Sequence, residues 1–200
     1  MLPVRQLARV LGKVQLITSH GPWSRAVAFQ NMLSPPPGVT GSPQPLWGGA
    51  SRLAGGRFTP RGGFDSIYLA GDPVTAFIEV SALILLPGGP VPVRSAPWVV
   101  VSVAGWLDQW LDLTAAATLA ALGSNEQEVT GTWVKLAHPP TQVLGQAPYD
   151  SGRITGLKYR SARHPGGINL AVFPDRLARA KNRFLEVYDP PGKLSQRLSG

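Results

Sequence analysis

The clearest hydrophobic pattern along the chain is a series of short apolar runs separated by turns. Five runs have the length and the β-branched and aromatic content of strands. They are SIYLA (66–70), PWVVVSVA (97–104), RITGLKYRSA (153–162), INLAVF (168–173) and RFLEVYD (183–189). The turns draw on 23 glycines and 20 prolines spread along the chain. This pattern predicts many short elements and excludes a helical bundle.

Helical signals are fewer. Asp72 and Pro73 suit an N-cap and a first helical position, and an apolar body follows up to PGGP at 87–90. On a helix of that length Ala76, Glu79, Leu83 and Leu86 would share one face. Further helices are predicted over 112–123, from near Pro140, and over the basic segment 175–181. Residues 34–50 show no periodicity and predict a long loop.

Strands and helices alternate without βαβ regularity, and no dinucleotide-binding glycine fingerprint is present. The order predicts a single α+β domain whose twisted, mostly antiparallel sheet is flanked by helices. We divide the 200 residues into an N-terminal extension (1–19), a core (20–190) and a tail (191–200).

Composition narrows the chemistry. The absence of cysteine excludes disulfides, thiolate metal sites and a cysteine nucleophile. Three histidines lie far apart without metal-ligand spacing, so we expect no metal site. No apolar run reaches the length of a membrane span, and the first twenty residues lack a signal-type stretch. We therefore expect a cytoplasmic protein that does not enter a membrane.

The net charge of +8 is unevenly distributed. Residues 1–64 carry seven basic and no acidic side chains, residues 65–150 two basic and eight acidic, and residues 151–200 ten basic and three acidic. A basic chain can bind nucleic acid. No nucleic-acid motif is present, however, so the pattern favours a cavity where basic side chains hold a small ligand that carries phosphate.

Arg57, Tyr68 and Glu79 form the strongest candidate site. Arg57 follows two glycines, where a guanidinium can form bidentate hydrogen bonds with a phosphate. The Tyr68 ring can stack on a flat heterocycle. Glu79 interrupts an apolar segment, where a carboxylate could stabilise a cation on a sugar ring or orient a hydroxyl. The alternative is a structural Arg57–Glu79 ion pair with Tyr68 in the core.

The run GGRFTPRGGFDSIYLAGDPVTAFIEV (55–80) resembles the signature of the RES-domain family. ITGLKYRSARHPGGINLAVF (154–173) is similar to that family's serine segment, and WSRAV (23–27) to its first arginine motif. DLTAAATLAALG and PPTQVLGQAPYDSG resemble the segments between them. The resemblance covers roughly residues 20–175. Two positions depart from the family pattern, because Phe58 stands where tryptophan is usual and Arg160 where proline is common.

This resemblance implies an ADP-ribosyltransferase-like fold and a toxin of a toxin–antitoxin system. RES toxins consume NAD by phosphorolysis or hydrolysis of the nicotinamide–ribose bond, as an NAD phosphorylase or NAD glycohydrolase, or by transfer of ADP-ribose. NAD is then the substrate, inorganic phosphate is the co-substrate of phosphorolysis, and no prosthetic group is needed. The family partner is an antitoxin with an Xre-type helix-turn-helix, which would provide any contact with nucleic acid.

The resemblance also implies roles for single residues. It assigns catalysis to Glu79, Arg57 and Tyr68, and NAD binding to Arg25, Arg57, Tyr68 and Ser161. Ser161 has a second interpretation, as a strand-end serine bonded to backbone. Two alternative functions stay open at this point: an ADP-ribosyltransferase that modifies a cellular protein, and a basic nucleic-acid-binding protein without catalysis.

Two tryptophans and a basic segment are further candidates for contacts. Trp106 and Trp110 have helical spacing and suit a core or a partner interface better than a cofactor site. The basic segment 176–197, with Arg176, Arg179, Lys181 and Arg183, would be a solvated face or a surface for an acidic antitoxin.

Overall fold

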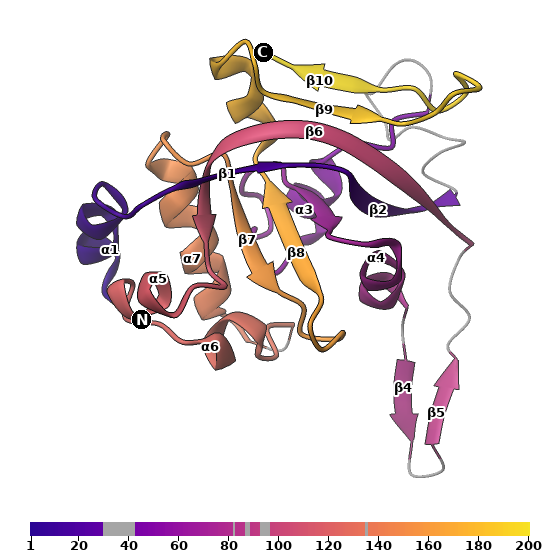
Figure 1. Ribbon diagram of the computed structural model, residues 1–200. Helices are drawn as coiled ribbons and strands as arrows, with labels where there is room; N and C mark the ends of the chain where they lie inside the picture. The colour runs from indigo at the N-terminus through magenta and orange to yellow at the C-terminus, as the bar shows by residue number, and fades with distance from the viewer. Residues whose placement is uncertain (30–42, 82, 87–88, 93–96, 135) are drawn as a thin grey trace.

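Strands form the frame of the molecule, and the helices gather mainly on one side of it (Figure 1). The computed structural model describes the chain except residues 30–42, 82, 87–88, 93–96 and 135, and it describes 83–86 and 89–92 by their backbone alone. Part of the predicted 34–50 loop therefore lies outside the described residues. The rest of that segment leads into helix α3 (Gly49–Ala54).

The main sheet has eight strands, in the order β10–β9–β6–β2–β3–β8–β7, with β1 paired beside β6. Every pairing is antiparallel except that of β6 with β7. The strands are β1 (Ile17–His20), β2 (Trp23–Ala28), β3 (Ile67–Ala70), β6 (Trp98–Asp112), β7 (Gly156–Arg160), β8 (Ile168–Val172), β9 (Phe184–Val187) and β10 (Arg197–Ser199). The predicted α+β domain with a mostly antiparallel sheet is confirmed.

Strand β6 joins the parts of this sheet. It pairs with β2 and β9 along its first half and with β7 at its end, so the sheet closes on itself. Strand β6 has a β-bulge opposite β1: Leu107 pairs with Ser19 and Trp110 with Ile17, so β6 has one extra residue between the two pairs. Gln109, inside the bulge, has φ 60°. Trp106 and Trp110 lie on this strand, and Trp110 is fully buried, so the predicted core position is confirmed for Trp110.

Helix α4 (Pro73–Val80) is shorter than predicted. The Asp72 carboxylate caps it by accepting a hydrogen bond of 2.8 Å from the Thr75 N–H. The helix ends at Ser81, whose hydroxyl donates to the Phe77 carbonyl. Residues 83–86 form strand β4 (Leu83–Leu86), which pairs with β5 (Gly89–Pro92) in a hairpin that projects from the body (Figure 1). The predicted helix face with Leu83 and Leu86 is therefore wrong, because a short apolar run fits a strand equally well.

The other helices among the described residues are α1 (Val4–Leu11), α5 (Ala116–Ala121), α6 (Glu126–Thr130), α7 (Pro140–Asp150) and the 3₁₀ helix η1 (Pro174–Arg179). The helix from Pro140 and the short basic helix are confirmed. The helix predicted from Asp112 starts later, since Asp112 ends β6 and its carboxylate accepts from the Thr114 N–H and hydroxyl. Gly123, with φ 61°, follows this helix as predicted.

Two hydrophobic clusters support the fold. One lies among the strands and includes Trp23, Val103 and Trp110. The other lies under α1, α5, α6 and α7, and it contains Leu7 and Leu11 of α1. Residues 1–19 therefore contribute fully buried side chains to the core.

The basic segment after β8 partly faces inward. Arg183 forms an ion pair of 2.5 Å with Asp108, and Arg176 lies over the Tyr149 ring. Both arginines are buried, so neither offers a charge to a partner surface. Within the described residues, no helix has the length and apolar character needed to cross a bilayer.

Candidate active site

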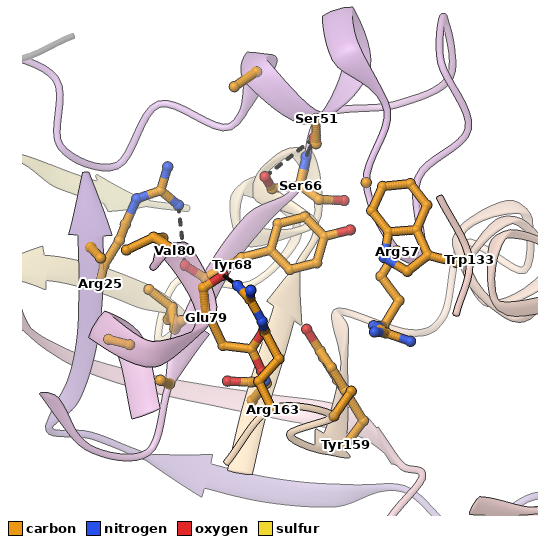
Figure 2. Close-up of a pocket in the computed structure, with 18 of the residues that line it drawn as sticks. Arg25, Ser51, Arg57, Ser66, Tyr68, Glu79, Val80, Trp133, Tyr159 and Arg163 are labelled. Atoms are coloured by element: carbon orange, nitrogen blue, oxygen red, sulfur yellow. Dashed lines mark hydrogen bonds between the residues drawn. The ribbon is translucent and has the colours of Figure 1, made fainter. Parts of the chain in front are cut away.

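A cavity of about 790 Å³ opens beside the central strands β2 and β3. Its walls come from these strands, from α3 and α4, and from the loops around residues 55–57, 130–134 and 162–163. Four of the five predicted site residues line it, namely Arg25, Arg57, Tyr68 and Glu79 (Figure 2). The fifth, Ser161, does not line the cavity but donates a hydrogen bond to Glu79.

Two neutral donors fix the carboxylate of Glu79. Its Oε1 accepts hydrogen bonds of 2.6 Å from the Ser161 hydroxyl and of 2.6 Å from the Asn169 side-chain amide. No ion pair reaches Glu79 from any described residue. The alternative of a structural Arg57–Glu79 ion pair is therefore wrong. The site holds an oriented carboxylate that forms no ion pair with any described residue.

Ser161 organises the turn after β7 as well as Glu79. Its hydroxyl oxygen accepts from the N–H groups of Arg163 and His164, at 3.1 and 2.8 Å, while its proton goes to Glu79. The alternative of a serine bonded to backbone is thus correct in part. Ser161 is placed to position the carboxylate, and the turn positions Ser161.

A second set of hydrogen bonds ties this turn to the start of α4. The Thr75 hydroxyl donates to the Asp72 carboxylate at 2.5 Å, and these bonds from Thr75 lower the pKa of Asp72. Since the Thr75 proton is used there, its oxygen must accept from His164 Nδ1, 2.7 Å away. His164 therefore carries a proton on Nδ1. The helix that bears Glu79 and the turn that bears Ser161 are held together at both ends.

Arg57 is held by the end of another helix. Its Nη1 donates to the carbonyls of Val129 and Gly131, both at 2.9 Å, where the C-terminus of α6 has free acceptors. The rest of the guanidinium faces the cavity. The two glycines before it have separate functions. Gly55 has φ 83°, and a side chain on Gly56 would lie 2.6 Å from the Tyr68 hydroxyl.

Tyr68 extends from β3 across the cavity wall. Its hydroxyl accepts a hydrogen bond of 3.1 Å from the Phe58 N–H, and burial raises its pKa above the usual 10. Phe58 itself is fully buried in the core, so the position at which the family usually has tryptophan does not line the cavity.

Arg25 provides a half-buried cation on β2. Its Nη2 donates to the Trp47 carbonyl at 2.8 Å and its Nη1 more weakly to the Tyr68 carbonyl at 3.4 Å. Its Nε has no partner, and no described carboxylate pairs with it. Burial lowers the pKa of Arg25 to about 10. An unpaired cation inside a cavity is suited to an anionic ligand.

Sequence reasoning missed four residues of the site: Asn169, which clamps Glu79, and Tyr159, Trp133 and Arg163, which line the cavity. Asn169 could have been found, because it is the one polar side chain in the run INLAVF. Arg163 donates to the Glu79 carbonyl at 2.7 Å. Trp133 gave no signal, since it lies in a loop whose path depends on α6 and α7.

Two comparisons with known proteins match most of the chain. The family model described as the RES domain matches residues 36–192, more than half of the chain. The structure resembles a chain in the crystal structure of the M. tuberculosis MbcT–MbcA toxin–antitoxin complex, with a TM-score of 0.64 and 18% identity. That match covers 97% of this chain and 92% of the other, and at this identity it establishes a shared fold. A comparison with curated protein sequences found no match.

Proposed function

The chain belongs to the RES-domain family, and from this premise we propose that it cleaves the bond between nicotinamide and ribose in NAD. The observation that carries the proposal is the carboxylate of Glu79. It is oriented by Ser161 and Asn169, faces a cavity and lacks a cationic partner among the described residues. A carboxylate held in this way suits a reaction in which positive charge develops on a neighbouring carbon.

Cleavage of NAD has this requirement. When the C1′–N bond of the ribose breaks, its electron pair leaves with neutral nicotinamide, and positive charge develops on the sugar. Glu79 would stabilise that charge without moving, because its donors already hold it. An oxygen of the acceptor then forms the new bond to C1′. Phosphate gives phosphorolysis, and water, which loses a proton, gives hydrolysis.

The rest of the cavity suits the rest of the substrate. Its volume of about 790 Å³ lies in the range of ligand pockets, roughly 300–1,000 Å³. Arg25 and Arg57 would hold the diphosphate, and the Tyr68 ring would stack on a flat heterocycle. Arg25 has no described carboxylate partner to compete with a phosphate. The proposal requires no metal or prosthetic group.

We extend the proposal to the biological role. The fold shared with a chain of the MbcT–MbcA complex supports a toxin of a toxin–antitoxin pair, which would act on NAD in the cytoplasm. Its partner would be an antitoxin with an Xre-type helix-turn-helix that blocks the cavity. Direct binding of nucleic acid by this chain is less favoured, because Arg176 and Arg183 are buried and paired inside the fold.

The test is to incubate the purified protein with NAD, with and without inorganic phosphate, and to identify the products by mass spectrometry. ADP-ribose-1″-phosphate would indicate phosphorolysis, and ADP-ribose would indicate hydrolysis. ADP-ribose attached to a protein of an added cell extract would instead indicate a transferase. NAD that stays intact under all three conditions would overturn the proposal.

A further inference from the structure

Tyr159, on β7, directs its hydroxyl into the cavity. Its side chain is only 5% exposed, and its ring packs edge-on against Phe58, with the ring centroids 4.6 Å apart. Figure 2 shows the hydroxyl end pointing to the middle of the site, between Glu79 on one side and Arg57 on the other. The ring is thus fixed by packing in the core, whereas the hydroxyl faces the ligand space.

No described residue forms a hydrogen bond with this hydroxyl. The hydroxyl opens to the cavity, so a ligand that displaces water there has to supply its partner, because a hydroxyl buried without one costs free energy. The neighbouring Tyr68 hydroxyl differs, because it accepts from the Phe58 N–H. Burial raises the pKa of Tyr159 well above its usual value, so the group keeps its proton and remains a donor. Such a donor is suited to an acceptor that a ligand supplies.

The neighbours of Tyr159 restrict what that acceptor can be. Glu79 uses Oε1 for Ser161 and Asn169, while no described residue binds its Oε2. The diphosphate of a bound ligand is better placed at the arginines of the cavity than against this carboxylate, which would repel it. An alcohol fits both groups, because it can accept from Tyr159 and donate to the carboxylate.

We infer that Tyr159 is a substrate-binding residue that donates a hydrogen bond to a hydroxyl oxygen of the ribose that carries nicotinamide. This inference rests on the proposed function and adds a recognition element to the same cavity. Tyr159 would make the cavity selective for ligands whose ribose has a free hydroxyl, since a ligand without it leaves the tyrosine donor without a partner.

The test uses Tyr159→Phe, which removes the hydroxyl and keeps the ring on Phe58. Tyr149→Phe is the matched control, because the Tyr149 hydroxyl bonds to Asp175 outside the cavity. We expect Tyr159→Phe to lower kcat/KM for NAD roughly tenfold, the usual value of one hydrogen bond. Calorimetry should show that Tyr159→Phe binds ADP-ribose more weakly, to a similar degree, and binds ADP with unchanged affinity. The melting temperature should not fall, because no protein contact is lost.

Unchanged ADP-ribose affinity and unchanged kcat/KM in Tyr159→Phe would overturn the inference. An equal loss for ADP and ADP-ribose would overturn it too, by placing the hydroxyl at the phosphates, as would the same loss in Tyr149→Phe. If the wild-type protein bound ADP-ribose but left NAD intact, the proposed reaction would fail, and the binding data would still decide the role of Tyr159.

Discussion

The hydroxyl of Ser161 donates a hydrogen bond of 2.6 Å to the carboxylate of Glu79, although 82 positions separate the two residues in the chain. Glu79 lies on α4 and Ser161 directly follows β7, and β3 and β8 of the same sheet bring these elements together. The orientation of the carboxylate is therefore a property of the whole fold, and it can be tested by substitutions on either side.

Glu79→Gln should separate catalysis from stability. The substitution keeps the shape and removes the charge, so we expect kcat to fall by on the order of 10² or more. Stability should stay level or rise by about 1 kcal/mol, because a half-buried charge without a described cationic partner is a cost to folding. Turnover assays and urea unfolding provide the two measurements. A fully active Glu79→Gln protein would rule out the proposed role of this carboxylate.

Ser161→Ala should impair catalysis through Glu79. With one of its two donors removed, the carboxylate is less well fixed, and we expect kcat to fall about tenfold with a smaller change in KM. Stability should fall by roughly 1 kcal/mol, since the N–H groups of Arg163 and His164 also lose their acceptor. Ser81→Ala is the matched control, because its hydroxyl caps the same helix outside the cavity. Equal kinetic losses in both variants would contradict a positioning role.

Arg25→Met tests whether the half-buried guanidinium of Arg25 binds an anionic ligand. We expect the stabilisation of the protein by ADP-ribose in thermal scans to shrink strongly, because the unpaired charge is lost. The melting temperature without ligand should change little, since burial of that charge already opposes folding. Arg153→Met is the control, because Arg153 also donates to backbone carbonyls but lies outside the cavity. Nicotinamide alone should stabilise neither variant nor wild type appreciably.

Alkaline pH should reveal the buried tyrosines. Burial raises the pKa values of Tyr68 and Tyr159, so both stay protonated in the folded state above pH 10, where an unfolded tyrosine ionises. The folded state then binds more protons than the unfolded state. Its extra stability is complete below pH 10 and is lost as the pH rises through the folded pKa values. Chemical unfolding at pH 8 and pH 10.5 should therefore show a decline that is smaller in Tyr159→Phe.

Local sequence signals predicted most elements of the fold. Asp72 and Pro73 predicted the start of α4, and the apolar run INLAVF predicted β8. The end of α4 was out of reach, because residues 83–86 take their strand form from pairing with β5. The length of β6 was also underestimated, since Gly105 and Asp108 interrupt the apolar run while pairing with β1 and β9 continues it.

For the candidate site as well, the sequence predicted single residues but not the contacts between them. Arg25, Arg57, Tyr68 and Glu79 could be named in advance, and all four line one cavity. Their partners could not be named. The alternative interpretation paired Arg57 with Glu79, whereas Arg57 binds the carbonyls that end α6. The partners of each hydrogen bond are set by contacts between segments that are distant in the sequence. The spacing of residues along the chain does not predict these contacts.

The long sequence separation of the Glu79 clamp also has a consequence for protein synthesis. A ribosome that has translated α4 has made the carboxylate, but the side chains that orient it follow 82 and 90 positions later. The nascent chain carries no ordered site until β7 and β8 have emerged and joined β3. A chain that terminates early, or that a protease cuts before Ser161, therefore contains the carboxylate of Glu79 without either donor that fixes it.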